Sequence, residues 1–113
     1  MIHTSYFANH RSFEDKKTVS IARFTPHWIK VDSIALELAP SVDLLMQLKH
    51  NVINIEEYAE KYKNEVLFKL NPAIIFEKYR NTVFLCFEKK GEFCHRQLVA
   101  EWLKENGFNI QEL

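Results

Sequence analysis

The sequence predicts an α/β fold: a small, mostly parallel sheet of three to five strands flanked by helices, in a Rossmann-like three-layer arrangement. Val83–Phe87 is apolar throughout. A short run without polar alternation is typical of a strand that is covered on both faces, as in a parallel sheet. Apolar residues at helical spacing follow this run. Apolar and polar residues then alternate over Phe108–Gln111, as in a short final strand. Together they predict a right-handed crossover that returns the chain to lie beside the Val83–Phe87 strand.

Length and composition limit the classes of protein to which the chain can belong. A chain of 113 residues, 47% of them hydrophobic, predicts a single domain over residues 1–113 with a proper core. The 15 basic and 15 acidic residues cancel, so there is no overall field to attract a membrane surface or nucleic acid, although a local patch could still contact nucleic acid. No apolar run is as long as a membrane span. Two cysteines without a signal peptide predict a cytoplasmic protein with free thiols. The oligomeric state is not indicated.

The first predicted strand is Ile2–Phe7, which is rich in β-branched and aromatic residues. The polar segment that follows it would lie at the carboxyl edge of the sheet if this strand is parallel to the Val83–Phe87 strand. Ser5, Tyr6 and Asn9 are therefore candidate ligand-binding residues. The alternative is an ordinary strand end without a binding role.

The second predicted strand is Thr18–Phe24, and Arg23 is the odd member of this otherwise small and apolar segment. Its side chain either extends along the surface to water or points its guanidinium into the pocket. Pro26 prevents the strand from continuing as part of a central ladder. Lys30–Ala39 alternates weakly and fits either an edge strand or a loop.

Three helices are expected in the middle of the chain, each introduced by a good N-cap residue. The caps are Ser41, Asn54 and Asn71, and the helices run to about His50, Leu70 and Arg80. Tyr58 and Tyr62 lie one turn apart on the apolar side of the second helix. Buried tyrosines of this kind usually belong to the core and have their hydroxyls hydrogen-bonded.

Cys94, His95 and Arg96 lie at the start of the next helix, shortly after the carboxyl end of a buried strand. Free backbone N–H groups and the positive end of the helix dipole attract anions at such a position. The same field and a nearby arginine lower the pKa of a thiol. Glu88 follows Cys86 by two residues, so both point to one face of the strand, and Glu88 could reach His95 or Arg96.

A resemblance to a known family rests on two blocks, LCFE and FCHRQLVAEWL. Further blocks are IHTSYFAN, VSIARFTPHW and NIEEYAEKYKNEVLFKLNP. In these the chain resembles the short form of the domain of unknown function 488 family over nearly its whole length. Longer members begin with an Asp-Val-Arg strand, and Ile21-Ala22-Arg23 keeps the arginine but lacks the aspartate. The resemblance implies a small α/β fold and leaves the activity open. It implies a site around Cys86, Glu88, Cys94, His95 and Arg96.

The first functional hypothesis is a pocket for a small anionic or nucleotide-like ligand with a reactive thiol, which makes the protein a candidate thiol-dependent enzyme. Cys94 would be the nucleophile, Arg96 would bind an oxyanion, and His95 or Glu88 would transfer protons. No metal or cofactor is expected in this hypothesis. The candidate ligand-binding residues are Arg96, Arg23, Tyr6, Ser5, Asn9, Tyr62 and Cys86, of which Tyr62 rests on the family resemblance.

Two alternatives use the same residues. Cys86, Glu88, Cys94 and His95 are of the types that bind zinc, although adjacent residues rarely both bind one ion from a helix start. In the other alternative the protein is a non-catalytic module that interacts with protein or nucleic acid. There Cys86 is a core residue and Arg96 forms a structural ion pair with Glu88. A disulfide between the two cysteines is not expected in a reducing compartment.

Overall fold

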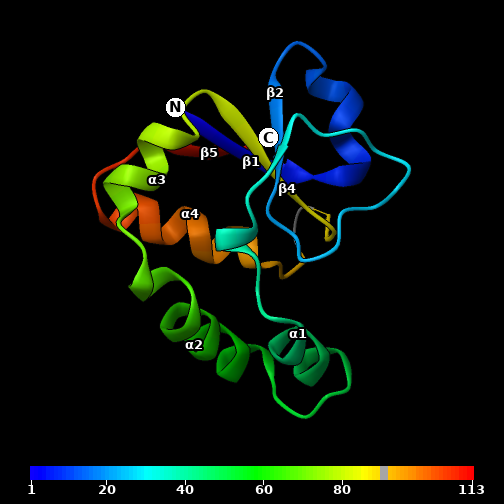
Figure 1. Ribbon diagram of the computed structural model, residues 1–113, viewed down its shortest axis with the longest axis vertical. Helices are drawn as coiled ribbons and strands as arrows, with labels where there is room; N and C mark the ends of the chain where they lie inside the picture. Colours follow the sequence, from blue (N-terminus) through cyan, green and yellow to red (C-terminus); the bar gives the residue numbers. More distant parts are fainter. Residues whose placement is uncertain (90–91) are drawn as a thin grey trace.

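The computed structural model describes residues 1–89 and 92–113, and it confirms the predicted α/β class with a parallel sheet (Figure 1). The sheet has five strands in the order β3-β2-β4-β1-β5, and every pair is parallel. The strands are β1 (Ile2–Tyr6), β2 (Lys17–Ser20), β3 (Ser33–Ile34), β4 (Thr82–Cys86) and β5 (Ile110–Glu112). No helix among the described residues combines the length and apolar character needed to cross a bilayer.

Strand β4 lies at the centre of the sheet, between β1 and β2. All five of its residues are buried, which explains why the apolar run shows no polar alternation. Cys86 lies opposite Tyr6 of β1, and Leu85 lies opposite Ser20 of β2. The predicted strand was shifted by one residue, because Phe87 already leaves the ladder and is half exposed.

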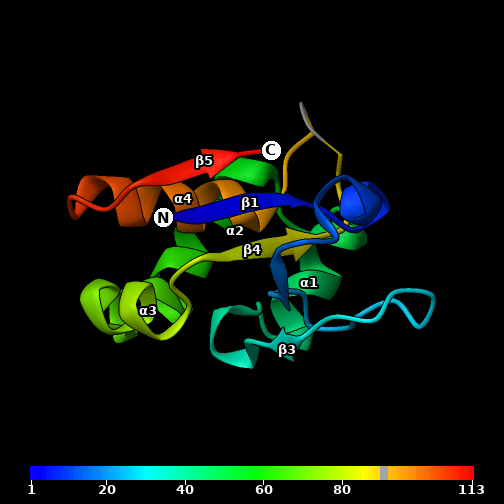
Figure 2. The ribbon, with the colours of Figure 1, turned by 90° about the horizontal axis from the view of Figure 1, so that it is seen from above.

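The four α-helices lie on one side of the sheet, and their buried residues share one core with β4. They are α1 (Val42–Lys49), α2 (Ile55–Glu65), α3 (Pro72–Lys78) and α4 (His95–Glu105). Seen from above, β5, β1 and β4 lie in front of α4 and α2 (Figure 2). The core on this side contains Phe84 and Cys86 of β4. Val83 and Leu85 point to the opposite face, where the 3₁₀ helix Phe7–Phe13 provides the cover.

The helix caps follow the sequence signals. The Ser41 hydroxyl accepts a hydrogen bond from the Leu44 N–H at the start of α1. Asn54 and Glu57 form a reciprocal capping box at α2. Gly107 follows α4 with a φ of +89°, in the left-handed region that a glycine adopts without strain.

Other elements also differ from the sequence-based expectation. Strand β2 ends at Ser20 instead of Phe24, where the Ser20 hydroxyl accepts hydrogen bonds from the Ala22 N–H and the Thr25 hydroxyl. Helix α2 ends at Glu65 and is followed by a short 3₁₀ turn. The expectation that the last strand lies beside the Val83–Phe87 strand was wrong: β5 pairs with β1, because β1 and β2 already occupy both edges of β4.

Candidate functional site

A pocket of about 90 Å³ lies where β4 ends and α4 begins. Parallel strands bring their carboxyl ends to one edge of the sheet, and the chain leaves β4 at Cys86 and enters α4 at the N-cap residue Cys94. The side chains that line the pocket and could take part in chemistry are Arg23, Tyr58, Cys86, Glu88, Cys94 and His95.

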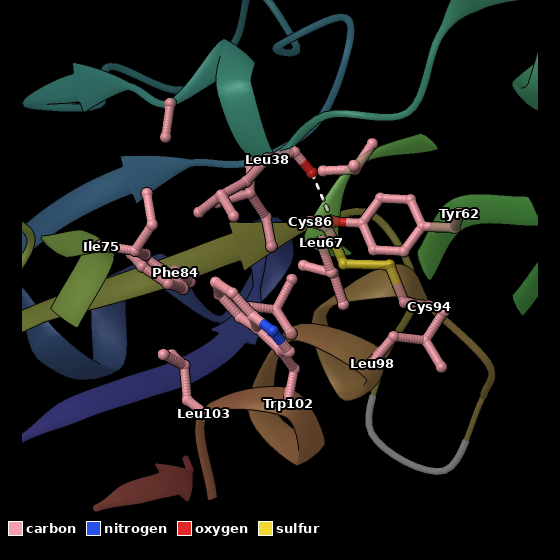
Figure 3. Packing of buried hydrophobic residues seen from close by; sticks show 14 of the residues in the cluster. Leu38, Tyr62, Leu67, Ile75, Phe84, Cys86, Cys94, Leu98, Trp102 and Leu103 are labelled. Atoms are coloured by element: carbon pink, nitrogen blue, oxygen red, sulfur yellow. Dashed lines mark hydrogen bonds between the residues drawn. A yellow bond between two sulfur atoms is a disulfide. The ribbon is translucent and has the colours of Figure 1, made fainter. Parts of the chain in front are cut away.

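The sulfur atoms of Cys86 and Cys94 are joined in a disulfide, with an S–S distance of 2.04 Å (Figure 3). Both residues are buried and both line the pocket. The expectation of two free thiols is therefore corrected. That expectation was inferred from a reducing cellular compartment. In the structure the end of β4 lies next to the start of α4, and this brings the two cysteines together at the pocket.

The Arg96 guanidinium is fully buried and all three of its nitrogens donate hydrogen bonds. Nε and Nη2 donate to the Glu112 carboxylate, with Nη2 at 3.0 Å from Oε2. Nη1 donates to the Cys86 sulfur at 3.2 Å and to the Glu88 backbone carbonyl. The ring of Tyr6 lies 5.9 Å from the guanidinium carbon. This arrangement corrects the predicted ion pair, because the partner of Arg96 is Glu112 and not Glu88.

Glu112 was missed by the sequence analysis. It lies on β5, two residues after Ile110, so both side chains point to the face on which α4 packs. The Thr4 hydroxyl of the neighbouring strand β1 also donates to its carboxylate. The available signal was an acidic residue on the core side of a strand. Its partner could be found only with the correct position of β5 in the sheet.

His95 is buried, and its two ring nitrogens have different surroundings. Nε2 lies 2.6 Å from the Ile21 carbonyl oxygen, which only accepts, so Nε2 carries the proton. Nδ1 lies 3.9 Å from the Cys94 sulfur and is free to accept a proton. Burial lowers the pKa of His95 to about 4; the hydrogen bond to Ile21 opposes this shift and the Arg96 charge adds to it. The imidazole is therefore neutral at pH 7.

Comparison with known families assigns the chain. A family model described as the active DUF488-N3 subclade matches residues 2–107. The chain belongs to the DUF488 family. Comparisons with curated proteins and with solved structures gave no match. Membership in DUF488 confirms the family resemblance, whereas the assignment of Cys-His-Arg as the functional signature stays a prediction.

Arg23 and Tyr62 are two further candidate residues of this DUF488 protein, and only Arg23 lines the pocket. The Arg23 Nε donates to the Pro40 carbonyl at 2.9 Å. Tyr62 is fully buried, and its hydroxyl donates to the Leu38 carbonyl at 2.6 Å (Figure 3). The Tyr62 ring packs edge-on against the His95 ring, with 5.5 Å between the ring centroids, and so restricts the position of the imidazole. Burial raises the pKa of the Tyr62 hydroxyl well above its ordinary value.

Ser5 and Asn9 lie away from this pocket. The alternation of β1 places Thr4 and Tyr6 on the face of α4 and Ser5 on the opposite face. The Asn9 side-chain amide donates to the Ser5 hydroxyl at 3.1 Å, so these two polar groups satisfy each other. Neither residue lines the pocket, and Tyr6 contacts Arg96 instead of the pocket space.

The pocket lining also contains a set of three atoms that could bind a metal ion. The two cysteine sulfurs and one nitrogen of His95 lie within 4.8 Å of one another. Glu88 was part of the predicted set but is not in this group, and its exposed side chain lies at the pocket mouth. Because the sulfurs are bonded to each other, they become metal ligands only after reduction to thiolates.

Proposed function

We propose that the protein is a thiol-dependent enzyme that acts on a small anionic or nucleotide-like ligand at the pocket between β4 and α4. The observation that carries this proposal is the buried contact of 3.2 Å between Arg96 Nη1 and the Cys86 sulfur. A guanidinium at hydrogen-bond distance stabilises a thiolate relative to a thiol and so lowers the thiol pKa. The thiolate is the nucleophilic form of cysteine.

We assign the two cysteines separate roles in the reduced protein from their different contacts. Cys86 is the better candidate for the thiolate, because Arg96 donates to it, whereas the sequence had favoured Cys94. Cys94 lies beside the unprotonated Nδ1 of His95, which can accept a hydrogen bond from its thiol. The Glu88 carboxylate at the exposed mouth could pass protons between the pocket and water.

The size and lining of the pocket limit the ligand. A volume of about 90 Å³ holds about three water molecules, so it admits a reacting group and not a whole nucleotide. Phe24 and Phe87 line the pocket and are 55% and 50% exposed, so they offer ring faces to the remainder of a ligand outside the pocket. Arg23 is the candidate for contacting the anion, since the Arg96 guanidinium is committed to Glu112.

A second candidate function is a non-catalytic interaction module, and one observation favours it. The hydrogen bonds of Arg96 to Glu112, Glu88 and Cys86 need no ligand to satisfy the buried cation. In this case the cluster joins β4, β5 and α4 and serves only stability. The two candidates differ in the titration behaviour that they expect of Cys86.

The test is the pKa of Cys86 in the reduced protein, measured in a Cys94→Ser background by thiolate absorbance near 240 nm. The enzyme proposal expects a pKa below the ordinary thiol value of about 8.5, and Arg96→Met should raise it. Arg80→Met changes an exposed arginine and is the matched control. Circular dichroism shows whether each variant folds. An ordinary thiol pKa in the folded Cys94→Ser protein would favour the non-catalytic module.

Ligand binding is tested separately with inorganic phosphate and adenosine monophosphate, followed by NMR chemical shifts. We expect shifts at the start of α4 and at Arg23, and Arg23→Gln should weaken binding severalfold. Arg11→Gln changes an exposed arginine outside the pocket and is the control. Chemical-shift changes that all lie outside the pocket, or equal affinities of the Arg23→Gln and Arg11→Gln variants, would remove Arg23 from the proposal.

A further inference from the structure

We propose that Cys86 and Cys94 form a reversible two-electron redox couple, with a hydroperoxide as oxidant and a dithiol as reductant. This inference rests on the proposed function, because it uses the same Cys86 thiolate. The two sulfurs are bonded in the structure, and both face the same small pocket. The pocket is the route for a reactant to reach them, since the two residues are only 0% and 7% exposed.

The two sulfurs have different neighbours, which assigns an order to the steps. Cys86 accepts a hydrogen bond from the Arg96 cation, whose own charge is balanced by Glu112. It is therefore the sulfur that is reactive as a thiolate in the reduced form and the better leaving group when the disulfide opens. Cys94 is the N-cap residue of α4, and it has a hydrogen-bond acceptor at His95 Nδ1 instead of a cation. Cys94 is therefore the resolving thiol.

Oxidation takes place in two steps. The Cys86 thiolate attacks the terminal oxygen of the hydroperoxide, so that an S–O bond forms and the O–O bond breaks. The products are a sulfenic acid on Cys86 and, after protonation of the leaving oxygen, water or an alcohol. The Cys94 thiol then gives up its proton and attacks the Cys86 sulfur. The S–S bond forms, the S–O bond breaks, and hydroxide leaves with that proton as water.

Reduction returns the same two electrons. One thiolate of the dithiol attacks the sulfur of Cys94, the slightly more exposed residue, and Cys86 leaves as a thiolate next to Arg96. The second thiol of the reductant then attacks the mixed disulfide, which releases Cys94 and leaves the reductant as a disulfide. While the protein is oxidised, the Cys86 nucleophile of the proposed enzyme is blocked.

The test uses the full chain, reduced with a phosphine and then freed of reductant. Sub-stoichiometric to stoichiometric hydrogen peroxide is added, and free thiols are counted by maleimide labelling and mass spectrometry. We expect both thiols to disappear together, one pair per peroxide consumed, and to return on addition of dithiothreitol. In Cys94→Ser the Cys86 sulfenic acid should persist and be trapped by dimedone. Cys86→Ser should react with peroxide at least tenfold more slowly than the Cys94→Ser variant.

Several outcomes would overturn the inference. These are loss of one thiol without the other, oxidation to sulfinic acid in the wild-type chain, or equal rates for the two single variants. A further contradicting outcome is tested by adding zinc to the reduced protein. Tight stoichiometric binding that protects both thiols from peroxide would assign the cluster to a metal site instead. Failure of the couple is distinguishable from failure of the proposed function. A low Cys86 pKa without disulfide formation contradicts only the couple, and an ordinary pKa contradicts the proposed function whatever peroxide does.

Discussion

The two faces of the central strand β4 differ in what covers them. Phe84 and Cys86 point toward the four α-helices, and on this face the buried cation Arg96 and the imidazole of His95 lie next to the pocket. On the opposite face Val83 and Leu85 pack with apolar side chains from the 3₁₀ helix that follows β1 and from the segment after β2. The helical face carries charge because α4 begins there and because β5 supplies an acid to it. In the proposed function the helical face therefore serves chemistry, whereas the opposite face serves packing.

The largest expected effect is on the helical face and comes from Glu112→Gln. This change leaves the Arg96 cation buried without its counter-charge, which should cost about 3–5 kcal/mol of unfolding free energy in urea denaturation. The double variant Arg96→Met with Glu112→Gln should recover most of this loss, because it removes the buried charge as well. A loss below about 1 kcal/mol for the single variant would contradict the structural importance of the ion pair.

A similar stability loss with no chemical effect is expected on the opposite face. Leu85→Ala leaves a cavity in the apolar cluster and should cost about 2–4 kcal/mol. The pKa of Cys86, measured as above in the folded variant, should stay unchanged. Val19→Ala on β2 is the matched control, because Val19 belongs to the helical core outside the pocket. A clear shift of the Cys86 pKa in Leu85→Ala would show that the two faces do not act separately.

The pH dependence of stability sharpens the comparison on the helical face. The folded pKa of His95 is about 4, below its unfolded value of 6.5, so the unfolded chain binds more protons between these values. Unfolding free energy should therefore be fully retained above pH 6.5 and fall as the pH drops toward 4. The contribution of this one group is at most about 1.4 kcal/mol per pH unit.

Urea titrations of wild type and His95→Gln between pH 5 and 7 measure this contribution. The variant should have a smaller pH slope, whereas His27→Gln, which lies outside the helical core, should keep the wild-type slope. Equal slopes for wild type and His95→Gln would contradict the neutral buried imidazole.

The smallest effect is expected from Tyr62→Phe. It removes the hydrogen bond to the Leu38 carbonyl and should cost about 1 kcal/mol. Because the Tyr62 ring remains against His95, the oxidation of the two thiols should slow by less than twofold. Tyr79→Phe, which loses a hydrogen bond to Glu37, is the control for stability alone. A tenfold slower oxidation in Tyr62→Phe would show that the hydroxyl itself takes part in the site.

Local sequence signals predicted much of the fold. They failed for features that depend on residues far apart in the sequence. The apolar run at Val83 predicted a strand buried on both faces, and Asn54 with Glu57 predicted the start of α2. The place of β5 depends on which sheet edge is free, and a run of three residues carries no such information. The acid Glu112 was missed for the same reason.

The candidate site shows the same division. Cys86, Cys94, His95 and Glu88 line one pocket, as a strand end followed by a helix start suggested. The sequence could not assign the partner of each group, because the Cys–Cys bond and the Arg96–Glu112 pair depend on side-chain directions across three elements. Expectations for Ser5 and Asn9 assumed that a strand end faces the pocket. The pleat of β1 turns Ser5 to the other side, and Asn9, on the 3₁₀ helix that follows, bonds to Ser5 there.

The order of the sheet also has a consequence for how the chain folds. Strands β1 and β2 are consecutive in sequence, yet they do not pair with each other, because β4 is inserted between them from about 65 to 80 positions later. Among the described residues, the only ladder between strands close in sequence is the two-residue pairing of β2 with β3. The loop-closure entropy must be overcome before most backbone pairing is gained, which favours slow, all-or-none assembly. Because Cys86 ends the strand that joins β1 to β2, the pocket wall depends on the same long-range pairing as the sheet.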